Sequence, residues 1–150
     1  MAESTLPAAR YAVPKLDDTL TREHLEAALR DEAVAAVEAS WFARIAEIEG
    51  EPEAARAFRE LAEQHQINAK GTLDLLLRAR EPLTGRPVGA TAANVAALTR
   101  FYSDDAESEA FRATTARREG FSDIGSWFES VGRLRAAHAG RLAALREGGE

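Results

Sequence analysis

Residues 58–75 read FRELAEQHQINAKGTLDL, and residues 128–145 read FESVGRLRAAHAGRLAAL. A shift of 70 residues places the second stretch on the first, with Phe128 on Phe58 and Leu145 on Leu75. In each stretch the residues of one helix face recur at alternating intervals of three and four, which is typical of a core seam between packed helices. The two seams are Phe58, Leu61, His65, Asn68, Thr72 and Leu75, and Phe128, Val131, Arg135, His138, Leu142 and Leu145.

The repeat extends from these seams to whole helical hairpins. Glu49-Gly50 falls on Glu119-Gly120 at the same shift, so each half predicts a helix, a glycine turn and a second helix. We expect hairpins at residues 21–80 and 91–147, with Thr21 capping the first helix and residues 1–20 forming an irregular arm. No stretch alternates with period two, so no strand is predicted. Two such hairpins can pack as an all-α four-helix bundle with a pseudo-two-fold axis.

The segment between the hairpins, residues 81–89, contains two prolines and two glycines and is predicted to be a loop. When extended it reaches roughly 30 Å, which approaches the length of one of the predicted helices. The loop could therefore cross the bundle lengthwise and leave the second and third helices parallel. An up-down-up-down bundle is the alternative.

Composition excludes several classes of protein. The 150 residues are 45% hydrophobic and 29% charged, which suits one soluble globular domain. The absence of cysteine excludes disulfides, thiolate metal sites and cysteine nucleophiles, and fits a cytoplasmic location. A formal charge of −6 without a basic run argues against nucleic acid as a partner. We expect neither a membrane span nor a secretory signal.

Polar residues interrupt both seams at mid-height. They are His65 and Asn68 in the first seam, and Arg135 and His138 in the second. Glu32 lies on the matching face of the first predicted helix. Because buried polar groups cost free energy unless they have partners, this polar layer is the candidate site. Trp41 and Trp127, in contrast, are interpreted as packing residues.

Residues 24–79 and 95–145 resemble the two halves of a rubrerythrin bundle. The resemblance is carried by RAFRELAE at residues 56–63, ARREGFSDIGSWFE at 116–129 and AHAGR at 137–141, each at the family's spacing from the glycine turns. It implies a ferritin-like four-helix bundle made of two antiparallel hairpins joined by a crossover loop. It also implies a homodimer, and the small-residue run at 33–37 would allow close helix contact.

The resemblance further implies a ligand pattern for two iron ions. This pattern has a glutamate on the first and third helices, Glu-x-x-His on the second and fourth, and an extra glutamate on the third. A slip of one residue on the third helix would offer Tyr102 and Asp105 instead of Phe101 and Asp104. The matching residues in this chain are Glu32, His65 and Asn68, Phe101 and Asp104, and Arg135 and His138.

Most of the implied ligands are therefore replaced. Arg135 is permanently cationic, so it cannot bind a metal ion and would repel one. We favour a network in which Arg135 pairs with Glu32 and Asp104. The hydrogen bonds of this network are completed by His65, Asn68 and His138. The alternative is a single metal ion held by His65, His138 and a carboxylate, either Glu32 or Asp104. The expected cofactor is thus none, or one iron, zinc or manganese ion, rather than an intact di-iron centre.

Two classes of function follow. The favoured one is a non-catalytic bundle in which polar contacts replace the metals. The alternative is a metal-dependent oxidoreductase that reduces peroxide or dioxygen. Because the chain lacks the cysteines of a rubredoxin domain, such an enzyme would need an external electron donor.

Overall fold

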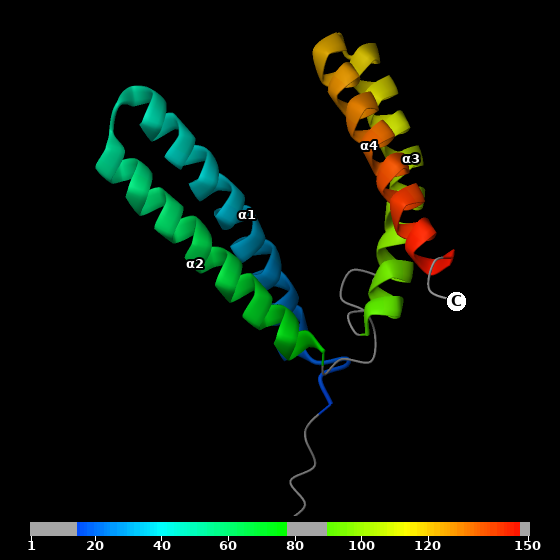
Figure 1. The fold of residues 1–150 in the computed structure, drawn as a ribbon, viewed down its shortest axis with the longest axis horizontal. Coiled ribbons are helices and arrows are strands. Elements are labelled where there is room, and N and C mark those ends of the chain that lie inside the picture. The colour runs from blue at the N-terminus through cyan, green and yellow to red at the C-terminus, as the bar shows by residue number, and fades with distance from the viewer. Residues whose placement is uncertain (1–14, 78–89, 148–150) are drawn as a thin grey trace, which may run out of the picture. The chain divides into compact units, whose positions relative to one another are not determined.

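The computed structural model describes residues 15–77 and 90–147, which form four α-helices and no strand. The helices are α1 (Leu20–Glu49), α2 (Pro52–Leu76), α3 (Thr91–Arg118) and α4 (Ser122–Glu147). α1 packs along α2, and α3 packs along α4, so the chain forms two helical hairpins, each described here by itself (Figure 1). The predicted all-α class, with the four helices of a ferritin-like fold, is confirmed. The expected loop at 81–89 and most of the expected arm lie outside the described residues.

The turns of the two hairpins are built alike, as the sequence repeat predicts. Gly50 and Gly120 have φ angles of 78° and 93°, a left-handed conformation that side chains with a Cβ rarely adopt. In the first turn the Glu51 N–H donates to the Ala46 carbonyl oxygen at 2.8 Å. In the second turn the Phe121 N–H donates to that of Ala116 at 2.8 Å. These bonds satisfy carbonyl groups that a helix end would otherwise leave unpaired.

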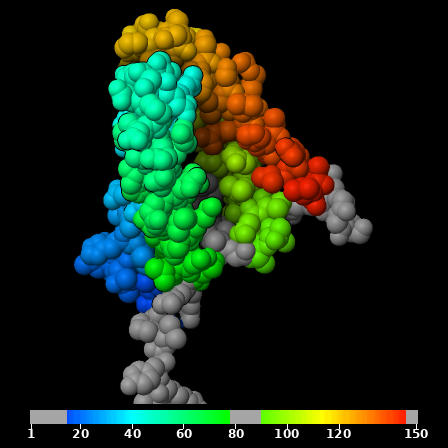
Figure 2. Space-filling model, turned by 60° about the vertical axis from the view of Figure 1, so that its left-hand side comes forward, coloured from blue at the N-terminus to red at the C-terminus, as the bar shows by residue number. Residues whose placement is uncertain are grey.

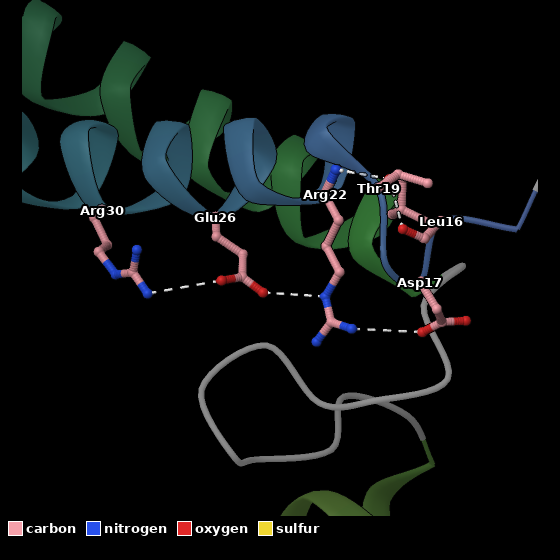
Figure 3. Close-up of polar contacts among 6 residues, drawn as sticks. All are labelled: Leu16, Asp17, Thr19, Arg22, Glu26 and Arg30. Carbon is pink, nitrogen blue, oxygen red and sulfur yellow. Dashed lines mark hydrogen bonds and ion pairs between the residues drawn. The ribbon is translucent and has the colours of Figure 1, made fainter.

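The first helix begins slightly earlier than expected. Thr19, not Thr21, is the cap: it has an extended backbone, and its side chain accepts a hydrogen bond from the Arg22 N–H at 3.1 Å. Its hydroxyl also donates to the Leu16 carbonyl oxygen at 2.6 Å (Figure 3). Thr21 lies inside the helix and cannot be its cap, because only the residue before the first turn can reach the free N–H groups. The first hairpin therefore starts at residue 20.

A ladder of ion pairs runs along the first turns of α1. Arg22 contacts Asp17 at 3.5 Å and Glu26 at 3.1 Å, and Arg30 contacts Glu26 at 3.8 Å (Figure 3). Asp17 precedes the helix, and its charge complements the positive end of the helix dipole. The ladder therefore connects the cap to the body of the helix.

The helix contacts inside each hairpin are made largely by alanine. Ala36, Ala39, Ala43 and Ala46 of α1 are buried, as are Ala55 and Ala62 of α2. Small side chains let two helices approach closely, and α2 lies against α1 in the space-filling view (Figure 2). Leu76 of α2 is the one larger apolar residue that is buried among the described residues.

Trp41 and Trp127, expected to be packing residues, are 55% and 67% exposed within their own hairpins. Alanines, rather than tryptophans, are the buried residues along α1, α2 and α3. None of the described helices combines the length and apolarity needed to cross a membrane.

Candidate functional site

The first hairpin brings three of the predicted site residues together: Glu32 from α1, and His65 and Asn68 from α2. Glu32 Oε2 lies 2.7 Å from Nδ1 of His65 and accepts a hydrogen bond from the Asn68 side-chain nitrogen at 3.2 Å. We call this set the first polar cluster. His65 and Asn68 are three residues apart on one face of α2, so both reach the same carboxylate oxygen.

The carboxylate of Glu32 is stabilised in its charged form. The hydrogen bond from His65 is the main cause that holds the pKa of Glu32 below its ordinary value of 4.5, and the bond from Asn68 acts in the same direction. Partial removal from water opposes this shift, because Glu32 and His65 side chains remain only 27% and 33% exposed. Oε2, one of the two carboxylate oxygens of Glu32, thus accepts hydrogen bonds from both His65 and Asn68.

The second hairpin holds a different cluster, built from ion pairs. Arg135 Nε of α4 lies 2.7 Å from Oδ2 of Asp105 and 3.9 Å from Oε1 of Glu109, both on α3. Arg112 of α3 contacts the same Glu109 oxygen and lies 3.9 Å from Oδ1 of Asp105. We call Asp105, Glu109, Arg112 and Arg135 the second polar cluster. Its two guanidinium groups balance its two carboxylates.

Burial makes this second polar cluster sensitive to change. Glu109 is 3% exposed and is the one buried charged residue among the described residues. Its Oε2 atom has no hydrogen-bond partner, and the close Arg135–Asp105 contact is an ion pair without hydrogen-bond alignment. A buried carboxylate is tolerated only when cations lie beside it, so Arg112 and Arg135 are required partners of Glu109.

Aromatic rings complete the surroundings of Arg135 and His138. The guanidinium carbon of Arg135 lies 5.1 Å from the centre of the Phe101 ring, within the range of a cation–π contact. The ring of Tyr102 lies 5.4 Å from that of His138. The resemblance predicts Phe101, or Tyr102 in the slipped register, at the position of the family's glutamate on the third helix.

Asp104 and Asp105 of α3 lie in different surroundings. Asp104 is exposed, whereas the Asp105 side chain is 14% exposed and contacts Arg135. The expected partners of Arg135 were Glu32 and Asp104; its partners in the structure are Asp105 and Glu109, from its own hairpin. Within this hairpin Arg135 thus contacts Asp105 of one register and Phe101 of the other, and the choice of register stays a prediction.

Sequence reasoning missed Glu109 and Arg112. A signal for Glu109 was present, because positions 105, 109, 113 and 116 follow the spacing of three and four that marks a buried helix face. A carboxylate in that stripe, four residues after Asp105, indicates an ion pair when the neighbouring helix carries an arginine, here Arg135. Arg112 lies outside that stripe, so the spacing offered no signal for it, and its side chain is 48% exposed.

No group of three or more histidine, cysteine, aspartate or glutamate side chains able to hold a metal ion occurs within residues 15–77 and 90–147. The first polar cluster contains one carboxylate and one imidazole. The second contains two carboxylates, both engaged by arginine.

The amino-acid sequence of the chain is similar to that of a known protein. No protein-family model matches the chain. A rubrerythrin from Porphyromonas gingivalis is 31% identical to it over 131 residues, which cover 83% of this chain and 65% of the relative. The chain thus spans slightly less than two thirds of the length of that relative. With its four helices in two equivalent hairpins, the chain is a divergent rubrerythrin-like protein.

Proposed function

We propose that this chain is a non-catalytic member of its fold class, in which hydrogen bonds and ion pairs stand where metal ligands are expected. The observation that carries the proposal is Arg135, whose Nε lies 2.7 Å from Asp105 and near the buried Glu109. A guanidinium group cannot bind a metal ion, and its charge opposes the approach of one. The polar clusters then act as structural elements that fix how the helices of each hairpin align.

The donor set supports this proposal and does not fit a di-iron centre. Two iron ions need several carboxylate oxygens to balance their charge. Here Glu32 is engaged by His65 and Asn68, and Asp105 and Glu109 are neutralised by two arginines.

The alternative is a metal-dependent oxidoreductase with a single ion. It is favoured by the proximity of Glu32 and His65, a carboxylate and an imidazole that could bind one metal if their mutual hydrogen bond opened. His138 and an external electron donor would complete such a system. Loading the chain with iron and then measuring peroxide consumption with a chemical reductant tests it. A rate no higher than that of free iron counts against the enzyme.

A restoration experiment tests the main proposal. The double change Arg135→Glu with Asn68→His removes the cation from between Asp105 and Glu109 and adds an imidazole beside Glu32. We expect this variant to bind Mn²⁺ or Zn²⁺ more tightly than the unmodified chain in calorimetric titration. Arg117→Glu is the matched control, because it makes the same charge change at an exposed position. Equal metal binding by the double variant and the control would contradict the proposal.

A further inference from the structure

The repeat of 70 residues offers α3 two partner helices of the same kind. Under the repeat α1 is equivalent to α3, and α2 is equivalent to α4. The buried faces of α1 and α3 share alanines at equivalent positions, such as Ala43 and Ala113, which are 4% and 2% exposed. Alanines alone distinguish poorly between two similar helices, so other residues must make α3 pack against α4 and not against α2.

The ion pair beside each turn has opposite polarity in the two hairpins. Glu47 of α1 contacts Arg59 of α2. In the second hairpin Arg117 Nη1 of α3 lies 2.5 Å from Glu129 Oε1 of α4. Glu47 and Arg117 are equivalent under the repeat, and Arg59 is equivalent to Glu129. If α2 took the place of α4, Arg59 would lie opposite Arg117, and two like charges would meet.

Gly125 of α4 leaves space for the Arg117 side chain. A Cβ at position 125 would lie 2.8 Å from Arg117 Cγ, which is too close for two carbon atoms. The equivalent residue of α2 is Ala55, which is fully buried in the first hairpin, where the shorter Glu47 stands in place of arginine. If α2 took the place of α4, the Cβ of Ala55 would therefore collide with Arg117.

Gly132 of α4 stands in the same relation to the buried Glu109. A Cβ at position 132 would lie 3.3 Å from Cβ of Glu109. In the first hairpin the equivalent residues are Ala39 and Ala62, two small residues that are both buried. The second hairpin thus combines a larger residue on one helix with the smallest residue on the other. Ala62 in the place of Gly132 would crowd Glu109.

We propose that Glu109 and Arg117 select α4 as the partner of α3 and exclude α2. Specificity between two partners is a difference in free energy, and both signs contribute here. Glu129 attracts Arg117, whereas the alanines and the arginine of α2 would crowd or repel α3. All the selecting residues belong to the second hairpin, so the selection does not depend on how the two hairpins are arranged.

Exchange of residues between equivalent helices tests this selection in the chain of 150 residues. The first variant gives α4 the residues of α2, through Gly125→Ala, Glu129→Arg and Gly132→Ala. Arg117 and Glu109 then face the residues that they are proposed to exclude. We expect the equilibrium constant for unfolding, extrapolated from urea titration, to rise at least about tenfold.

The second variant adds Glu109→Ala and Arg117→Glu, which give α3 the residues of α1. It carries five substitutions, yet the second hairpin then has the ion pair and the small residues of the first. We expect its unfolding constant to fall at least about tenfold below that of the first variant. If each residue only stabilised its own helix, two more substitutions would destabilise the chain further.

The matched control carries Glu63→Arg, Gly71→Ala and Gly140→Ala. These are the same kinds of substitution at exposed positions, and a Cβ on either glycine meets nothing within 4 Å. The control should be no less stable than the unmodified chain.

A first variant as stable as the control overturns the proposal. So does a second variant that is no more stable than the first, including the case in which neither variant folds. All three chains keep Glu32, His65 and Arg135, so these results do not decide whether polar contacts replace metal ligands.

Discussion

Arg135 is the residue on which most of the second polar cluster depends. Arg135→Ala leaves Asp105 and the buried Glu109 with Arg112 as their remaining cation. Loss of one partner from a buried ion pair costs about 3–5 kcal/mol, so we expect the free energy of unfolding in urea to fall by about that amount. Arg117→Ala is the control, because the Arg117 and Glu129 side chains are 40% and 46% exposed. It should cost no more than about 1 kcal/mol, and equal losses for the two variants would contradict the account.

Glu32 makes a prediction about pH. Its pKa is lower in the folded chain than the ordinary 4.5, so its stabilising contribution is complete above pH 4.5 and is lost as pH falls through the folded-state pKa. His65→Ala removes the hydrogen bond that is the main cause of the shift. We expect the pKa of Glu32, followed by NMR of its carboxyl carbon, to rise towards 4.5 in this variant. An unchanged pKa would show that His65 does not stabilise the charged form of the Glu32 carboxylate.

The candidate residues were predictable from sequence only in part. His65, Asn68 and Glu32 were placed by the seam period, since all three lie on helix faces that the spacing of apolar residues identifies. The choice between Asp104 and Asp105 was not predictable, because neighbouring positions differ by about 100° around a helix and α3 has few large apolar residues to fix its register. The contact of Arg135 with Glu109 depends on side-chain packing that no spacing rule describes.

At the scale of the helices, glycines test how closely α3 and α4 approach. A Cβ on Gly125 would lie 3.2 Å from the Ala113 carbonyl oxygen and 2.8 Å from Cγ of Arg117. Because the carbonyl belongs to the backbone of α3, Gly125→Ala should separate the helices and cost about 1–3 kcal/mol. Gly71→Ala, on α2, should instead stabilise the chain by about 1 kcal/mol. Nothing lies within 4 Å of the added Cβ, and alanine favours a helix more than glycine does. Thermal unfolding of both variants checks the opposite signs; two shifts in the same direction would argue against this close packing.

The helices themselves were largely predictable. The repeat of 70 residues located both glycine turns, and their matching φ angles and hydrogen bonds follow from the shared Glu-Gly pair. The start of α1 was misplaced by two residues, because Thr19 and Thr21 are equally good capping residues in sequence. Asp18, with a φ of 57°, forms the bend that selects Thr19.

At the scale of the whole molecule, the chain has the four helices of a rubrerythrin-like protein, and we propose that its polar clusters replace the ligand pattern of that family. The similarity to a rubrerythrin extends over 83% of the chain at 31% identity, so it spans most of the chain although most aligned residues differ. The buried Glu109 and its arginine partners illustrate how a metal can be replaced: an arginine can take the place of a metal ion as the partner of a buried carboxylate.

Metal content tests the central claim most directly. The unmodified chain of 150 residues is produced in cells supplied with iron, manganese and zinc, desalted, and analysed by inductively coupled plasma mass spectrometry. Because arginines and hydrogen bonds occupy the carboxylates, the account predicts less than about one equivalent of these metals per chain. A chain that purifies with about two tightly bound iron ions would contradict it.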